Sequence, residues 1–214
     1  MINDNSLFNT IMETLNSATL VSSELPQMVF RPGYGRFHFF EFDLTFSEKF
    51  WAVIQKIAFQ ARINMISIDP DPVEYFFKEF GQFGAIQINA SATADEYYEA
   101  LCAHPPSYPL DSLFHSETLA WFPDSARWLV WGERGYGVAV LGLHKDFDSP
   151  IDRIARDAGM PLLSLDEALS DIVSLNFRDS AAFEAFSIDF KTNYSDGEIY
   201  DEKKLDELFD KFSD

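Results

Sequence analysis

The sequence predicts a mixed α/β fold, of the α+β kind, in which a central sheet is flanked by helices. Three observations predict it. Apolar residues alternate or run together in short segments, they recur at helical spacing between and after these segments, and 47% of the 214 residues are hydrophobic. A chain of this length and composition can bury one sizeable core, so we expect a single domain over residues 1–214.

The first half of the chain alternates between helical and extended patterns after an opening helix. Leu7, Ile11 and Leu15 recur at helical spacing, with Ser6 as a plausible N-cap. The spacing predicts further helices at 47–61, 73–81 and 93–103, and strands at 36–43, 63–68 and 85–90. The rigid stretch HPPSYP at 104–109 follows, and it is the one plausible internal boundary.

The second half begins with strands and ends with helices. Three apolar segments joined by the short turns PDSA and GERGY favour a β-meander with strands at 118–122, 127–131 and 137–143. A helical C-terminal region follows, with predicted helices at 149–159, 164–177, 180–190 and 201–212. Ser149 is the expected cap of the first, with Pro150 at its first helical position. The last helix lies in an acidic tail at 195–214.

Negative charge is the strongest global feature of the chain. It carries 35 acidic and 16 basic residues, which gives a formal net charge of −19. This field repels nucleic-acid backbones and anionic membrane surfaces, and it would attract a basic protein and speed its association. We therefore expect no nucleic acid and no membrane among the partners, although solubility alone also explains such a charge.

The single cysteine, Cys102, precludes an intramolecular disulfide and suits a reducing compartment. The first ten residues lack a basic segment followed by an apolar core, so we expect no secretion signal. No run approaches the roughly 18 apolar residues of a membrane span. These observations together favour a cytoplasmic protein.

The sequence lacks the short motifs that mark common catalytic and cofactor sites. It has no phosphate-binding loop, no GxGxxG, no GxSxG and no HExxH. No two of the four histidines stand four residues apart, as a helical zinc site would require; they are His38, His104, His115 and His144. We therefore expect no catalytic residues, no cofactor and no metal.

Two acidic stretches contain possible metal ligands, but we expect neither to bind a metal. In DPDP at 69–72, a proline follows each aspartate, and Asp71 before Pro72 suits a helix N-cap better than a magnesium ligand. In the turn around Gly197, a calcium loop would place Thr192 at its first position and Lys203 at its twelfth, where acids are needed.

The stretch GERGYG at 132–137 combines an acid, a base and three glycines between two apolar segments. The glycines permit a tight reversal, and charged residues fit its solvent-facing tip, so a β-hairpin turn explains the stretch. Alternatively Trp131, Arg134 and Tyr136 present the residue types that carry most of the energy at protein interfaces. Both interpretations stay open from sequence.

Several segments resemble the immunity proteins that bacteria encode beside polymorphic and contact-dependent toxins. The resemblance rests on a series of segments: Y75-F-F-K-E-F-G-Q-F-G-A-I86, D95-E-Y-Y-E-A-L101, D111-S-L113, L119–Arg134 and V138-A-V-L141. Within it, the pattern P-x-S-x-x-W-x-V-x-G-x-R is matched by Pro123, Ser125, Trp128, Gly132 and Arg134. It covers about residues 75–141, a third of the chain. It implies a protein that neutralises a cognate toxin and needs no catalytic residues.

The expected function is therefore that of an immunity protein, not an enzyme, whose partner is a basic, nuclease-like toxin that it blocks at the active site or substrate surface. The alternatives are an enzyme with a site assembled from dispersed acidic or metal-binding residues, and a soluble acidic adaptor. The candidate partner-binding residues are Trp131, Glu133, Arg134, Tyr136, Asp196, Glu198, Asp201 and Glu202.

Overall fold

A computed structural model describes residues 1–68, 73–106 and 113–195. Several features named above lie wholly or partly outside these ranges: the DPDP turn at 69–72, part of the 104–109 stretch, Asp111 and Ser112, the turn around Gly197, the predicted helix 201–212 and four of the candidate residues. These four are Asp196, Glu198, Asp201 and Glu202.

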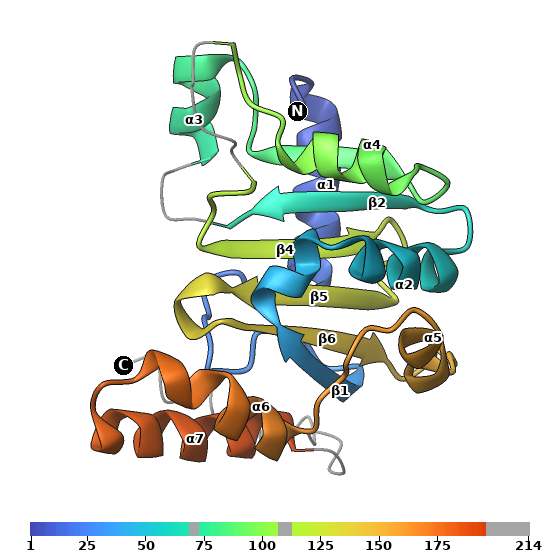
Figure 1. Ribbon diagram of the computed structural model, residues 1–214. Helices are drawn as coiled ribbons and strands as arrows, with labels where there is room; N and C mark the ends of the chain where they lie inside the picture. Colours follow the sequence, from blue (N-terminus) through green and yellow to red (C-terminus); the bar gives the residue numbers. More distant parts are fainter. Residues whose placement is uncertain (69–72, 107–112, 196–214) are drawn as a thin grey trace.

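The core of the fold is a six-stranded sheet in which every neighbouring pair of strands is antiparallel (Figure 1). The strand order is β1-β6-β5-β4-β2-β3. The strands are β1 (Tyr34–Glu41), β2 (Arg62–Ser67), β3 (Ala85–Asn89), β4 (Thr118–Pro123), β5 (Trp128–Glu133) and β6 (Val138–His144). The mixed α/β fold expected from sequence is confirmed, and all six strands lie where the apolar patterns place them, within about two residues.

The meander predicted for the second half forms the centre of the sheet. β4 pairs with β5 and β5 with β6, each antiparallel to its predecessor in the chain. β2 then pairs with β4, and β1 with β6, so strands from both sides of the 104–109 segment join one sheet.

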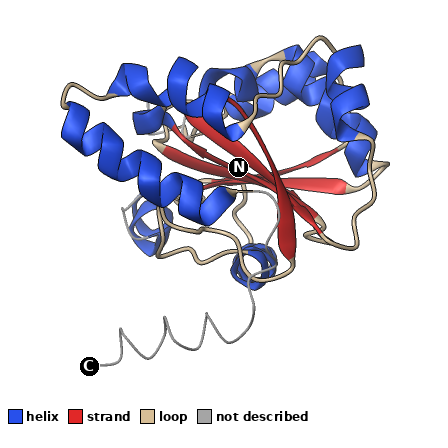
Figure 2. Ribbon diagram, turned by 90° about the horizontal axis from the view of Figure 1, so that it is seen from below, coloured by secondary structure: helices blue, strands red, loops and turns tan. Residues whose placement is uncertain are grey.

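Helices cover both faces of the sheet (Figure 2). One face packs against α1 (Asn5–Ala18), α6 (Leu165–Asp171), the 3-10 turn η3 (Val173–Asn176) and α7 (Ser180–Tyr194). The opposite face packs against η1 (Phe42–Phe46), α2 (Glu48–Ala58), α4 (Ala94–Leu101) and α5 (Ile151–Asp157). Short α3 (Val73–Phe80) connects β2 to β3. Every residue of β5 is buried as a result.

Several helices begin at a side-chain cap. Ser47 caps α2, and capping boxes are present at α4, formed by Thr93 and Glu96, and at α6, formed by Ser164 and Glu167. In the box at α6, hydrogen bonds from Ser164 lower the pKa of Glu167.

Three details of the helical prediction are wrong. Asp4, not Ser6, caps α1, because its carboxylate accepts from the Ser6 and Leu7 amides. Pro150 occupies the N-cap of α5, where Ser149 was expected, and no side chain caps that end. The helix predicted over 164–177 stops at Asp171 and continues as the separate turn η3, whereas the next helix extends beyond Phe190 to Tyr194.

Short segments cover part of each open edge of the sheet. At the β3 edge, the Ile2 amide donates to the Ala85 carbonyl at 2.9 Å. At the β1 edge, the backbones of Phe39 and Leu163 exchange hydrogen bonds in both directions, 2.8 Å and 3.4 Å long. Such partial pairing limits uncontrolled strand addition at sheet edges.

Two strand glycines leave room for rings packed against the sheet. A Cβ at Gly142 would lie 2.5 Å from the Phe30 ring, and one at Gly132 would lie 2.8 Å from the Phe42 ring. Each ring therefore packs directly on the backbone of a central strand, and overpacking at either point would shift a strand or a ring.

We expect Gly142→Ala to lower the free energy of unfolding by about 1–3 kcal/mol, because the added methyl overlaps the Phe30 ring. Urea denaturation measures the change. Gly135→Ala is the matched control, since no atom lies within 4 Å of its added Cβ, and it should stay within about 1 kcal/mol of the wild type. Equal effects of the two substitutions would contradict the packing described for Phe30.

Candidate functional site

The GERGYG stretch forms the connection between β5 and β6. Glu133 is the last residue of β5 and pairs with Val138, the first of β6. Between them lies the single 3-10 turn η2 (Arg134–Tyr136), and Gly137 follows with a φ of +68°, a conformation that favours glycine. The β-hairpin expected from sequence is confirmed.

The acid of this hairpin is buried, although a solvent-facing turn was expected. Glu133 is 5% exposed. Its Oε1 accepts hydrogen bonds from the Leu25 amide at 2.7 Å and from the Trp131 indole at 2.8 Å. The prediction of an exposed tip fails for this residue because the segment before β1 folds over the end of β5.

Burial raises the pKa of the Glu133 carboxyl from its ordinary 4.5 to about 7. The two hydrogen bonds favour the ionised form and oppose this rise, while the negative charge of nearby Glu24 adds to it. Both donors bind the same oxygen, so a protonated carboxyl keeps both bonds with its carbonyl oxygen.

The segment that covers Glu133 is held at its other end by α7. The Tyr194 hydroxyl accepts from the Val29 amide at 3.1 Å and donates to the Gln27 carbonyl at 2.8 Å. The Asn193 amide donates to the Pro26 carbonyl at 2.9 Å. Glu133 and the last turn of α7 thus fix residues 25–29 between the hairpin and the C-terminal helices.

Arg134 holds a second segment, the one that precedes β4. Its guanidinium donates to the backbone carbonyls of Phe114, at 2.5 Å, and Ser116, at 3.2 Å. It lies over the Phe42 ring, 4.7 Å from the centroid, and approaches Asp43 at 3.5 Å. Arg134 therefore bonds the backbone before β4 and has an internal carboxylate partner in Asp43.

The other two candidates of this region pack inward to different degrees. Trp131 is 1% exposed and lies in the core. Tyr136 is half-buried against the rings of Phe177 and Phe186, whose centroids lie 5.9 Å and 4.6 Å away. Burial, followed by the charges of Glu133 and Glu24, raises the pKa of the Tyr136 hydroxyl. The aromatic-arginine group predicted as a partner surface thus has internal contacts at every member.

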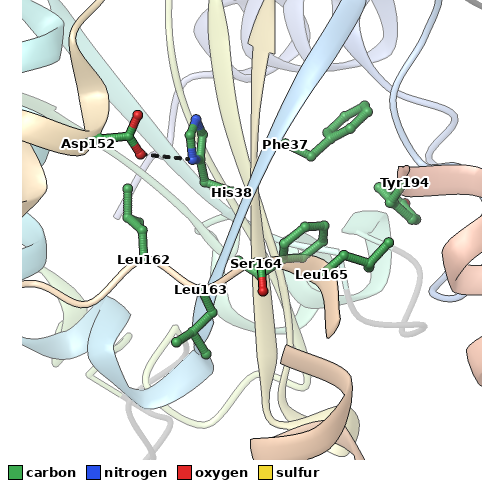
Figure 3. A pocket seen from close by; sticks show the side chains of 9 residues that line it. Phe37, His38, Asp152, Leu162, Leu163, Ser164, Leu165 and Tyr194 are labelled. Carbon is green, nitrogen blue, oxygen red and sulfur yellow. Dashed lines mark ion pairs between the residues drawn. The ribbon is translucent and has the colours of Figure 1, made fainter. Parts of the chain in front are cut away.

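Sequence reasoning missed a pocket of about 240 Å³ at the open edge of β1 (Figure 3). It lies between β1, the 162–165 segment and the ends of α5 and α7; its lining residues are Phe37, His38, Phe39, Asp152, Leu162, Leu163, Ser164, Leu165 and Tyr194. His38 Nδ1 lies 3.6 Å from an Asp152 carboxylate oxygen. These two residues are far apart in sequence, so no local pattern could have joined them.

The pocket is lined by a histidine, an aspartate and a serine, but the serine hydroxyl is hydrogen-bonded to the helix that it caps. The Ser164 hydroxyl donates to Glu167 at 2.7 Å and accepts from the Glu167 amide, as the cap of α6. A nucleophilic serine needs a hydrogen bond to its base, whereas this hydroxyl is engaged with a carboxylate of its own helix. The arrangement suits binding better than acyl transfer.

The remaining polar side chains that chemistry could use are dispersed. Within the described ranges, no three His, Cys, Asp or Glu side chains come together as a metal site. Cys102, at the end of α4, is partly buried. His144 lies 3.5 Å from Asp146, and His104 contacts the Pro105 carbonyl.

The surface of α6 and α7 is acidic. The two helices lie side by side along one edge of the molecule (Figure 1). Between residues 165 and 195 there are six acidic residues, all exposed: Asp166, Glu167, Asp171, Asp179, Glu184 and Asp189. Only two basic residues, Arg178 and Lys191, lie in the same range, and Lys191 forms a 2.6 Å ion pair with Asp166.

Comparison with known proteins finds no matching family, no matching curated sequence and no matching solved structure. In the part of the chain that the structure describes, none of the helices has the length and apolar character required to cross a bilayer.

The raised pKa of Glu133 predicts a pH-dependent stability. The folded protein holds a proton that the unfolded chain releases above pH 4.5, so this residue's contribution is complete below pH 4.5 and is lost as the pH rises through about 7. Glu133→Gln keeps an oxygen for both donors and never ionises. Its stability relative to the wild type should therefore rise between pH 4.5 and 7, by up to about 3 kcal/mol.

Urea denaturation at several pH values measures this difference. Glu13→Gln, which removes an exposed acid from α1, tests whether losing any one negative charge has the same effect. A constant difference between Glu133→Gln and the wild type across this pH range would show that the Glu133 carboxyl is not buried as described.

We expect Arg134→Lys to destabilise the protein nearly as much as Arg134→Ala, by about 1–3 kcal/mol, because an ammonium cannot reproduce a planar fork that bonds two carbonyls and lies over a ring. Thermal unfolding monitored by circular dichroism measures both. Arg127→Lys is the control, since Arg127 is exposed. If Arg134→Lys were as stable as the wild type, the positive charge alone would account for the contribution of Arg134.

Proposed function

We propose that this protein is a bacterial immunity protein that binds a basic, nuclease-like toxin and blocks its active site or substrate surface. The observation that carries the proposal is the acidic surface of α6 and α7, where six exposed carboxylates accompany two basic residues. A cleft that binds nucleic acid must be positively charged, so a surface of this kind complements it.

The hairpin enters this proposal as scaffold, whereas a contact surface was expected there. The residues that match the immunity-protein pattern include Trp128, which is 1% exposed, Gly132, which lies under the Phe42 ring, and Arg134, which holds the 114–116 backbone. The pattern therefore describes a scaffold requirement. Trp131 and Glu133 are only 1% and 5% exposed, so they are not part of the proposed contact surface. We place that surface on the C-terminal helices instead.

Inhibition by occlusion requires no chemistry from this chain. The negative field of α6 and α7, which is part of a net charge of −19, speeds encounter with a cationic partner. Affinity then comes from the desolvated contacts in the centre of the interface, whereas rim charges mainly set the association rate and its salt dependence. On this proposal the protein acts in the cytoplasm of the cell that makes the toxin.

Co-expression with the toxin encoded by the adjacent gene tests the proposal. We expect growth to be rescued, a stable complex to be recovered at low salt, and the association rate to fall steeply with ionic strength. The absence of a complex at low salt with that toxin would exclude this function.

Charge reversal locates the surface. The pair Glu184→Lys and Asp189→Lys on α7 should lower the association rate by roughly tenfold at low salt, because both side chains are exposed on the acidic surface. The matched pair Glu13→Lys and Glu99→Lys, on α1 and α4, changes the net charge equally. Stopped-flow kinetics compares the two pairs, and equal slowing would show that net charge alone steers the toxin.

A further inference from the structure

The pocket beside β1 opens where the covering of that strand stops. Phe39 and Leu163 exchange two backbone hydrogen bonds, but the chain turns into α6 at Leu165 and leaves the strand. In an antiparallel ladder, alternate residues direct their backbone groups to opposite sides of the strand. Since Phe39 bonds away from β6, Phe37, two residues earlier in an unbroken register, directs its amide and carbonyl the same way.

The Phe37 backbone is therefore turned toward the pocket. Within the described ranges, no segment outside β6 pairs with it. This combination of an open strand edge and an adjoining pocket is the geometry that accepts an extended peptide as an additional strand.

The pocket has two sides of different character, one on each face of β1 (Figure 3). On one side His38 points toward Asp152, beside Leu162. On the other side Phe37 points toward Tyr194, and the two rings pack edge to face with centroids 5.2 Å apart. The first side thus offers an exposed carboxylate beside Leu162, and the second is lined by Leu165 and by the largely buried rings of Phe37 and Tyr194.

We propose that this edge binds an extended, basic segment of the partner, which pairs with β1 at Phe37 and inserts one side chain on each face. Side chains of a strand alternate between faces, so neighbouring residues of the segment reach the two sides. An arginine or lysine fits the Asp152 side, with its stem on Leu162. An apolar residue fits against Phe37 and Tyr194.

The carboxylate of Asp152 favours a cation on the first side. Its side chain is 72% exposed, whereas Asp166 at the start of α6 is already paired with Lys191. The acidic surface of α6 and α7 adjoins the same pocket through Leu165 and Tyr194. This inference rests on the proposed function, because it names the contact through which a basic toxin would be held.

A designed peptide tests the edge without the toxin. The probe is a blocked pentapeptide of alternating valine and arginine, and two comparison peptides carry N-methyl groups on the central residues or glutamate in place of arginine. We expect the probe to shift the backbone amide resonances of Phe37, His38 and Leu163 in ¹⁵N spectra. Both comparison peptides should fail to do so, because the first cannot pair as a strand and the second is repelled.

Asp152→Asn should weaken binding of the probe about three- to fivefold, the range expected for an exposed charge pair. Asp157→Asn, on the same short helix but outside the pocket lining, is the matched control and should leave the affinity unchanged. The proposal is overturned by a probe that does not bind, by equal binding of the N-methylated peptide, or by equal affinity for wild type and Asp152→Asn.

Its failure is distinguishable from failure of the proposed function. If the toxin forms a complex whose affinity is the same for Asp152→Asn and the wild type, the immunity function stands and this edge is not its contact. If no toxin complex forms at low salt but the basic peptide binds as described, the edge is a peptide site and the immunity function fails.

Discussion

The structure depends on one constraint: the central strand β5 is buried along its whole length, so both faces of the sheet must be covered. If helices covered only one face of the sheet, the four large apolar side chains of β5 could not all be buried. The chain meets this constraint by placing α2, α4 and α5 on one face and α1, α6 and α7 on the other. The hydrophobic effect, which scales with the apolar area removed from water, is the main reason this arrangement holds.

The same constraint explains the polar residues at the end of β5. A buried carboxyl or guanidinium is costly unless its hydrogen-bonding groups are satisfied. Glu133 is satisfied by Leu25 and Trp131, and Arg134 by the carbonyls of Phe114 and Ser116. Each polar contact fixes a loop that has no regular structure of its own. The hairpin is thus the point at which the loops before β1 and β4 are anchored.

Local patterns were sufficient to predict the six strands and most of the helices that the structure describes. Alternation in residues 85–89 and the cap residues Thr93 and Ser164 act over a few positions, so their consequences can be inferred from sequence. The break after Asp171 could not, because the separation of α6 from η3 involves tertiary contacts such as that of Asn176 with the Tyr136 carbonyl.

Such local patterns could not predict contacts between segments that are distant in sequence. The burial of Glu133 depends on Leu25, more than a hundred residues earlier, and the pocket at β1 joins His38 to Asp152. Nothing near Glu133 in sequence distinguishes it from an exposed turn acid. The strand order also had to come from the structure, since hairpin turns specify only neighbours in the meander.

The hairpin is structural, and the proposed binding surface lies on α5, α6, α7 and the β1 edge. Both proposals place the partner on the same side of the molecule, because the pocket adjoins the acidic helices. Hydrogen exchange of the protein, free and bound to the toxin of the adjacent gene, tests this separation most directly. We expect slowed exchange at residues 35–39 and 151–195, with η2 and residues 113–117 unchanged. Protection centred on the 132–137 hairpin, with the C-terminal helices unchanged, would contradict it.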